Sequence, residues 1–297
     1  MKKILLLFVI AIITINVNGQ KLKPYVLAGY SSSDINTVKS EVKQKLKSNG
    51  FEVLGTYNPM NSNGRIVIVV SNSDLTSSVN NVGGYTGFAL ALRVALTKEN
   101  GKTMISYTNP EYWGRAYFTK KWNKVSSKYA SLISKFKTAL SGYEGSNFSQ
   151  FGSEKGLSTS KLKKYHYMMG MPYFEDNIEL KEFGSFSEAI SKIDQNLSTG
   201  VPGVKKVYSK KVGNMKLYGL ALTGKDGEKR FMSKIDVSSP KHTAFLPYEM
   251  LVLGNKAYML HGRFRIALAF PDLSMSQFMK IVSTPGYIED KFEEVCK

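Results

Sequence analysis

Two β-rich runs separated by a Gly-Asn step constrain the fold more than any other part of this sequence. The first run covers residues 245–253, the step is Gly254-Asn255, and the second run covers residues 256–270, just before Pro271. A two-residue step of this composition typically joins two antiparallel strands. The chain must therefore build an antiparallel sheet that accepts this hairpin.

The second run alternates between apolar and other side chains, which assigns its residues to the two faces of a strand. One face is large and apolar, and we expect it in the core. The other face carries His261, Arg263 and Arg265. Two guanidinium groups and an imidazole in one groove would hold a carboxylate or a phosphate. The alternatives are a sheet face neutralised by acidic residues of the other repeat, or a bulge at Gly262 that separates the three.

A weaker copy of the same unit occurs near residue 90. Residues 88–97 and 102–108 form a second predicted hairpin, and Asn109-Pro110 begins a helix after it, much as Pro271 precedes one later in the chain. Both halves repeat the order helix, strands, hairpin and proline-started helix. The sequence therefore indicates an internal duplication.

Arg93 and Glu249 occupy matched positions when Gly87 is aligned with Thr243. In a symmetric dimer a residue near the twofold axis meets its own copy, whereas a duplicated chain can place opposite charges there. We therefore expect an ion pair at a pseudo-twofold axis, the alternative being that both side chains point to solvent. Together with the strand face, this gives the candidate ligand-binding residues: His261, Arg263, Arg265, Arg93, Glu249 and Tyr248.

Composition divides the chain into four segments. Residues 1–20 combine two lysines, an apolar run and a small-residue site ending at Gly19, which is typical of a cleaved export signal; an uncleaved membrane anchor is the alternative. Residues 21–140 form the first repeat domain. Residues 141–164 are rich in Gly and Ser and lack a hydrophobic period, so they predict a linker. Residues 165–297 form the second, divergent repeat domain.

Further elements follow from hydrophobic periods and helix caps. Helices are predicted after Asp34, over residues 122–140 and after Ser185, where Glu188 completes a capping box. In the second half, three strands are predicted between the capped helix and the hairpin: residues 203–211, 215–223 and 228–235.

The first half resembles a known family. The stretches GFEVLGTY and RIVIVVSNSDLTSSVNNVGGYTGFALALRVALTKENGKTMISYTNP resemble domain-of-unknown-function family 302, over about residues 34–140, and residues 178–296 resemble a more divergent copy. The resemblance implies an α+β fold of two related domains, each a curved antiparallel sheet with helices packed on one face. It also suggests that single-domain relatives pair, so that a tandem copy would act as an internal dimer. It implies no catalytic residues, because the family has no established catalytic set.

The chain is strongly basic, with 41 Lys and Arg residues against 23 Asp and Glu and a net charge of +18. Such a balance favours anionic partners. Because an exported protein does not meet intracellular nucleic acid, we expect no nucleic-acid partner, and at most peripheral contact with an anionic envelope surface. The alternative is that the lysines form an ordinary solvated surface. The predicted location is periplasmic or extracellular.

Metal binding and catalysis find little support. His166, Met168, Met169 and Met171 offer soft ligands suited to Cu(I), but the same residues could line a site for an apolar ligand or fill a core. Cys296 is the single cysteine, so no internal disulfide forms. No nucleophile, zinc or phosphate-loop motif occurs. We therefore expect no cofactor and no enzyme activity.

The sequence thus predicts an exported, non-catalytic protein that binds a small or anionic ligand in the cleft between two related domains. The alternative is an envelope structural or interaction protein that associates with anionic polymer or lipid through its Lys-rich surface. The duplication favours a monomer with an internal pseudo-dimer over a higher oligomer.

Overall fold

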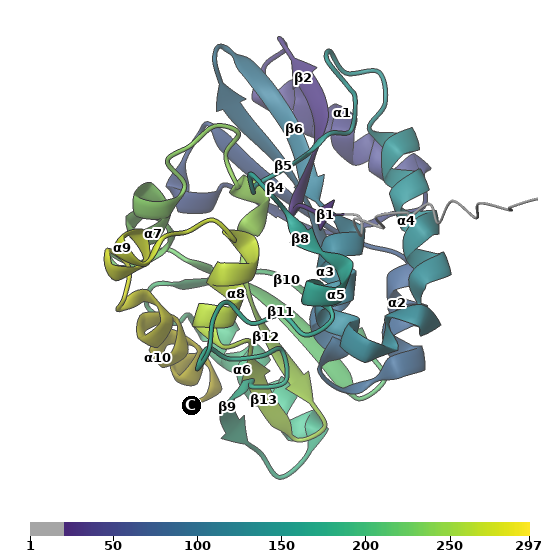
Figure 1. Cartoon of the computed structure of the whole chain (residues 1–297). Helices are drawn as coiled ribbons and strands as arrows, with labels where there is room; N and C mark the ends of the chain where they lie inside the picture. Colours follow the sequence, from purple (N-terminus) through teal and green to yellow (C-terminus); the bar gives the residue numbers. More distant parts are fainter. Residues whose placement is uncertain (1–20) are drawn as a thin grey trace, which may run out of the picture.

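The computed structural model describes residues 21–297, which form two antiparallel sheets with helices around them (Figure 1). The first sheet has six strands in the order β3-β4-β5-β6-β2-β7, and the second has five in the order β10-β11-β12-β13-β9. A short third sheet pairs β1 with β8. The fold is α+β, as the sequence predicts. The expected export signal lies outside the described residues.

The first half and the segment after it contain these elements: β1 Lys21–Leu22, β2 Tyr25–Ser31, α1 Ile35–Ser48, β3 Glu52–Tyr57, η1 Pro59–Asn61, β4 Arg65–Ser71, α2 Ser73–Val82, η2 Gly84–Ala89, β5 Leu92–Glu99, β6 Lys102–Thr108, α3 Pro110–Phe118, η3 Thr119–Lys124, α4 Ser126–Ala139, β7 Gln150–Phe151, β8 Leu157–Ser158 and α5 Thr159–Leu162.

The second half contains these elements: β9 Ile178–Glu182, α6 Phe186–Thr199, β10 Val204–Val212, β11 Met215–Leu222, α7 Glu228–Ile235, η4 Thr243–Phe245, β12 Tyr248–Leu253, β13 Lys256–Met259, α8 Gly262–Ala269, α9 Met275–Met279 and α10 Thr284–Cys296. None of the helices formed by residues 21–297 is long and apolar enough to cross a bilayer.

Each sheet has helices on one face. In the first half, α1 buries the apolar stripe Ile35, Val38, Val42 and Leu46, and its N-terminus is capped by Asp34, whose carboxylate accepts the Asn36 N–H. α4 packs on the same face, where Phe136 stacks on Tyr107 of β6 at 4.6 Å between ring centroids. In the second half, α6 and α10 take the corresponding places against β9, β10, β12 and β13.

The two sheets follow the same topology. Within each half, the first strand (β2 or β9) lies beside the fifth, and the order β3-β4-β5-β6-β2 corresponds to β10-β11-β12-β13-β9. The correspondence extends to an irregularity: β3 shifts register between Val53 and Gly55, and β10 between Lys206 and Tyr208. A bulge at the same place in both edge strands gives an internal reference for matching residues between the halves.

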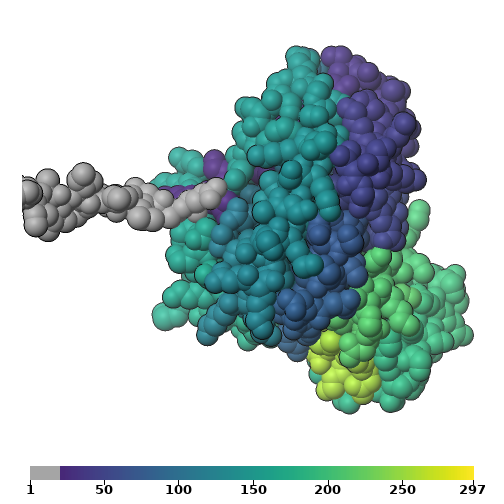
Figure 2. All heavy atoms as spheres, turned by 90° about the vertical axis from the view of Figure 1, so that its right-hand side faces the viewer, coloured from purple at the N-terminus to yellow at the C-terminus, as the bar shows by residue number. Residues whose placement is uncertain are grey.

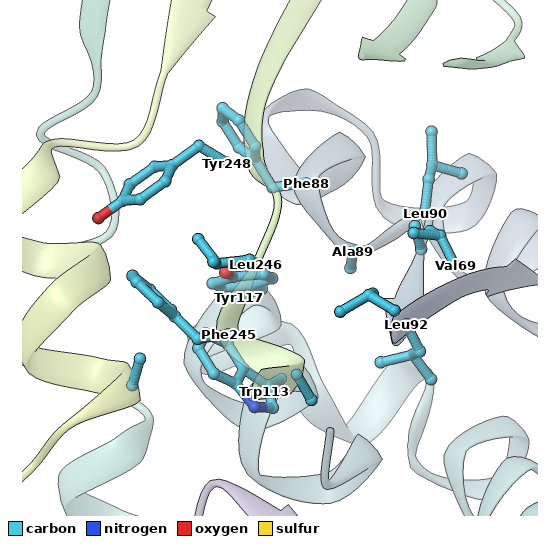
Figure 3. Packing of buried hydrophobic residues seen from close by; sticks show 14 of the residues in the cluster. Val69, Phe88, Ala89, Leu90, Leu92, Trp113, Tyr117, Phe245, Leu246 and Tyr248 are labelled. Carbon is cyan, nitrogen blue, oxygen red and sulfur yellow. The ribbon is translucent and has the colours of Figure 1, made fainter. Parts of the chain in front are cut away.

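The two halves pack against each other reciprocally. η2 of the first half contacts β12 of the second, and η4 of the second half contacts β5 of the first. Gly87 permits the first contact, because a Cβ there would lie 2.6 Å from Leu251 Cδ1. Figure 3 shows residues of both halves at this boundary, where Phe245 of η4 lies beside Trp113 of α3. Figure 2 shows the halves in direct contact on the side that it presents.

The central hairpin is confirmed, but its second strand is shorter than predicted. Leu253 pairs with Lys256 around the Gly254-Asn255 turn, and β13 then ends at Met259. The chain continues as α8, so the predicted strand over residues 260–270 is wrong. A longer ladder has no partner, because β12 starts at Tyr248 and the preceding Pro247 has no N–H to donate. α8 is buried on nearly all sides, and such a helix shows no amphipathic period in its sequence.

Two further sequence predictions are wrong in type. Residues 228–235 form the helix α7 and not a strand: Phe231, Met232 and Ile235 are buried on one helical face while Lys229 and Lys234 are exposed. Residues 84–89 form the 3-10 helix η2, so the strand predicted from residue 88 begins only at Leu92. Both stretches are short, and a run of eight residues fits a strand or a helix period almost equally well.

The Gly/Ser-rich segment 141–164 lies against the first half. β7 pairs with β2, and β8 pairs with β1. Its glycines permit close packing: a Cβ at Gly152 would lie 2.7 Å from the Tyr25 ring, and one at Gly156 would lie 2.9 Å from the Leu22 carbonyl oxygen. Composition alone cannot distinguish glycines used in this way from those of a flexible linker.

Candidate functional site

One cross-strand row has the same position in both sheets. In the first sheet, Gly55 pairs with Val69, which pairs with Arg93. In the second, Tyr208 pairs with Gly219, which pairs with Glu249. Gly55 and Tyr208 each follow the bulge of their edge strand. Arg93 and Glu249 are therefore structural equivalents, as the sequence alignment predicts.

The expected ion pair is present. The Arg93 guanidinium contacts the Glu249 carboxylate, and the Tyr208 hydroxyl donates to Glu249 Oε1 at 2.6 Å. Both charged residues are almost completely buried, with 2% of Arg93 and 3% of Glu249 exposed. Gly219 makes room for this contact, because a Cβ at that position would overlap the Tyr208 ring. The alternative that both charges point to solvent is wrong.

Arg265 joins the pair from α8. Its Nη2 lies 3.6 Å from Glu249 Oε2 and donates to the Phe245 carbonyl oxygen at 2.9 Å. Its guanidinium carbon lies 4.8, 5.0 and 5.9 Å from the ring centroids of Trp113, Phe245 and Tyr248. Cation–π contacts with three rings compensate part of the charge that is removed from water. We refer to Arg93, Tyr208, Glu249 and Arg265 as the seam cluster.

Burial has opposing effects on the charges of the seam cluster. Loss of solvent alone would lower the pKa of Arg93, but the Glu249 carboxylate raises it well above the ordinary value. Burial, with the Glu249 charge adding to it, raises the pKa of the Tyr208 hydroxyl. Arg93 therefore stays charged, and Tyr208 remains a hydroxyl donor. The cluster sets two guanidinium groups against one carboxylate and is closed to solvent, so it joins the two halves and leaves no opening to an external ligand.

The remaining predicted site residues lie elsewhere. Because residues 262–269 are helical, His261, Arg263 and Arg265 do not share a strand face, and the predicted three-residue anion site does not form. His261 caps α8, where its Nδ1 accepts the Arg263 N–H at 3.2 Å. The Arg263 side chain is exposed, whereas Arg265 is buried. Four of the six candidates, Arg265, Arg93, Glu249 and Tyr248, come together; His261 and Arg263 do not join them.

An open cleft lies beside the seam, at the N-terminus of α7. It has a volume of about 300 Å³ and takes its walls from both halves. The first half contributes residues around η1, and the second half contributes parts of β10, β11 and α7. Its lining is Thr56, Tyr57, Asn58, Met60, Asn61, Lys205, Lys206, Val207, Ala221, Leu222, Thr223, Gly224, Glu228 and Lys229. We refer to it as the Glu228 cleft.

Glu228 is the one acidic residue of this lining, and it is 2% exposed. Its Oε1 accepts the Tyr57 hydroxyl at 3.1 Å and the Leu222 N–H at 3.3 Å, and its Oε2 accepts the Met60 N–H at 3.0 Å. Burial raises the pKa of this carboxyl to about 7, although the three donors favour the charged form. Glu228 therefore changes its charge near neutral pH.

Two lysines of the Glu228 cleft are free to meet a ligand. Lys205 and Lys229 are exposed and form no ion pair within the described part of the chain. Lys206 differs, because its Nζ lies 3.5 Å from an Asp194 carboxylate oxygen. The cleft thus combines two uncommitted ammonium groups with a buried carboxyl that has no cationic partner among residues 21–297.

The loop opposite Glu228 is held in an unusual conformation. Met60 and Asn61 have φ values of 61° and 53°, in the left-handed region that side chains other than glycine seldom adopt. The hydrogen bond from the Met60 N–H to Glu228 Oε2 links this loop to the second half. Strained backbone of this kind is concentrated at ligand sites.

A second cleft lies at the other end of α7 and has a volume of about 330 Å³. His242 and Asp236 line it, and burial lowers the pKa of His242 to about 4, so the imidazole is neutral. The Asp236 carboxylate accepts the backbone N–H of His242 at 2.8 Å and pairs with Arg65 at 2.5 Å. Asp272 accepts the Ser153 hydroxyl. Glu154 also lines the cleft, and three acidic residues in one lining make it a weaker candidate for an anion.

The methionine and cysteine candidates also have defined places. His166 Nδ1 lies 2.8 Å from the Met168 carbonyl oxygen, and its ring packs on Tyr173. Met169 is 95% exposed, which agrees poorly with a role in core packing. Cys296 is buried, and burial raises the pKa of its thiol to about 12, so the reactive thiolate is disfavoured.

Sequence reasoning missed Glu228, Lys205 and Lys229. The sequence predicts a strand over residues 228–235, so no helix N-terminus is expected there. The available signal was the helical spacing of Phe231, Met232 and Ile235 after an acidic first residue.

Comparisons with known proteins give one structural likeness to report. No family model matches the sequence, and no curated protein matches it. The chain is similar to the crystal structure of an uncharacterized conserved protein DUF302 from Bacillus stearothermophilus, with a TM-score of 0.33 and 18% sequence identity. The likeness covers 39% of this chain and 94% of that chain, and it concerns the fold alone.

Proposed function

We propose that this protein is an exported, non-catalytic binding protein, built from two tandem copies of one fold, that holds a small anionic ligand in the Glu228 cleft. The proposal departs from the sequence-based one in the residues that carry it. The seam cluster fixes the two halves relative to each other, and the open cleft beside it receives the ligand.

The tandem-copy part of the proposal is supported by topology. The strand orders of the two sheets correspond, both edge strands carry the bulge, and Arg93 and Glu249 sit at equivalent positions. The reciprocal packing of η2 on β12 and η4 on β5 is what a pseudo-twofold arrangement requires. This arrangement supports the proposal of a monomer with an internal pseudo-dimer.

The anionic class of ligand is supported by charge. The single observation that carries the proposal is a cleft of about 300 Å³, walled by both halves, in which Lys205 and Lys229 are uncommitted. Ammonium groups bind carboxylates, sulfates and phosphates as point charges. A volume of this size suits a small molecule.

A thermal-shift screen of small carboxylates, sulfate and phosphates tests the proposal. A ligand at a hundredfold excess over its Kd stabilises the folded state by about 2.7 kcal/mol. We expect a saturable increase in Tm that the Lys205→Ala/Lys229→Ala double variant loses. Lys234→Ala is the matched control, because this lysine lies on the same helix, is exposed and does not line the cleft. A shift that survives in the double variant would contradict the proposed site.

The alternative function is attachment to an anionic envelope polymer or lipid. It is favoured by exposed lysines on η3 and α4, namely Lys120, Lys121, Lys124 and Lys137. Co-sedimentation with anionic vesicles tests it, and binding should fall steeply as salt rises. Loss of vesicle binding in a variant lacking these lysines, with Lys205 and Lys229 intact, separates this function from the first.

A further inference from the structure

We propose that the Glu228 cleft takes up its anion together with one proton, and that Glu228 carries this proton. The inference rests on the proposed function and adds its regulation: the anion is captured at mildly acidic pH and released at alkaline pH. It assigns Glu228 a role that neither the duplication nor the seam cluster requires.

The position of Glu228 is the first support. Its carboxyl lines the same cleft as Lys205 and Lys229, so its charge acts directly on anything bound there. Its three hydrogen-bond donors are all neutral: the Tyr57 hydroxyl and two backbone N–H groups. Within residues 21–297 no Lys, Arg or His nitrogen lies within 4.0 Å of it, in contrast to Glu249 of the seam cluster.

The groups that face Glu228 are few. β3 presents Tyr57, β10 presents Lys205 and Lys206, and β12 presents Tyr248. Burial raises the pKa of both tyrosines, so neither contributes a negative charge. On its own helix and the preceding turn, Lys229 is exposed, and Asp226 is paired with Arg230. Glu228 is thus the one acid of the lining, and it has no cationic partner among residues 21–297.

The consequence for binding follows from charge. A charged Glu228 repels an anion in the cleft, whereas a protonated Glu228 does not. Since the pKa of this carboxyl is raised to about 7 by burial, both forms are populated near neutral pH. An anion that favours the protonated form shifts the population toward it, and binding then consumes a proton.

The size of the effect can be bounded. If the anion binds only the protonated form, the apparent Kd is the intrinsic Kd divided by the protonated fraction. With a pKa of about 7, the affinity at pH 8.5 should be about 30-fold lower than at pH 5.5. The decline should begin near pH 7.

Isothermal titration with sulfate at constant ionic strength tests the inference, because sulfate remains a dianion between pH 5.5 and 8.5. We expect the wild type and Lys234→Ala to lose affinity across this range, and Glu228→Gln to bind with a nearly constant Kd. Titrations in two buffers of different ionisation enthalpy should show uptake of close to one proton above pH 7 in the wild type. This second readout needs no variant at position 228.

The outcomes distinguish the two proposals. Absence of any sulfate binding that depends on Lys205 and Lys229 would overturn both the proposed function and the inference. Binding that depends on the lysines but shows one Kd at pH 5.5 and 8.5, without proton uptake, would overturn the inference alone. A pH dependence that persists unchanged in Glu228→Gln would also overturn it.

Discussion

Glu249 and Glu228 are both buried at the boundary between the two halves, and both accept a tyrosine hydroxyl. They differ in what else they meet. Glu249 faces two guanidinium groups in a closed cluster, whereas Glu228 meets only neutral donors and opens onto a cleft. A buried carboxylate that meets guanidinium groups contributes to the contact between the halves, whereas a buried carboxyl that meets only neutral donors has a raised pKa.

The largest expected effect on the free energy of unfolding concerns the ion pair of Arg93 and Glu249. Arg93→Ala should destabilise the protein by about 3–5 kcal/mol, because Glu249 would remain buried without its main partner. Denaturant unfolding measures the change, and a double-mutant cycle with Glu249→Ala isolates the coupling. A coupling free energy below about 0.5 kcal/mol would contradict a stabilising ion pair between Arg93 and Glu249.

A second prediction compares two neighbours on α8. Phe264 is buried and Arg263 is exposed. Phe264→Ala should cost about 3–5 kcal/mol as a core truncation, while Arg263→Ala should change the free energy of unfolding by less than about 1 kcal/mol. Equal losses of unfolding free energy, measured by chemical denaturation, would contradict the burial of Phe264 and the exposure of Arg263.

The free energy of unfolding should depend on pH through Glu228. Because the pKa of Glu228 is raised to about 7 in the folded state, its contribution to stability is fully present below about pH 4.5 and is lost as pH rises through about 7. The loss is on the order of 3 kcal/mol. Comparing urea unfolding of the wild type with Glu228→Gln between pH 4.5 and 8 isolates it. Parallel pH profiles for the two proteins would contradict the burial of an unmatched carboxyl.

The smallest expected loss of stability concerns the glycine that lets Tyr208 reach Glu249. A Cβ at Gly219 would overlap the ring of Tyr208. Gly219→Ala should therefore push the tyrosine hydroxyl away from Glu249 and destabilise the protein by about 1–3 kcal/mol. Adding Tyr208→Leu should relieve part of this loss, since the overlapping ring is gone. If the glycine substitution costs as much in the Tyr208→Leu background, the proposed overlap is not its cause.

The sequence was most informative where a local signal and the global arrangement agreed. The Gly254-Asn255 turn and the strands beside it were predictable, because turn chemistry acts within a few residues. The pairing of Arg93 with Glu249 agrees with the expectation drawn from the alignment of the two halves. Neither prediction required knowledge of distant neighbours beyond that alignment.

The sequence was least informative where surroundings decide the structure. α8 is buried on almost every side, so its residues alternate by chance and lack the one-sided pattern of a surface helix. The position of Arg265 among three aromatic rings depends on Trp113, about 150 residues earlier in the chain. No local sequence pattern predicts this contact. Glu228 likewise becomes notable only when η1 is placed against α7.

The most direct test of the difference between the two glutamates is a carbon-13 NMR titration of the Glu228 carboxyl in the wild type, with and without sulfate. The account predicts a midpoint near pH 7 that sulfate moves upward, and that no longer responds to sulfate in Lys205→Ala/Lys229→Ala. A midpoint near 4.5, the ordinary value for a glutamate, would contradict it, as would a midpoint that sulfate leaves unchanged.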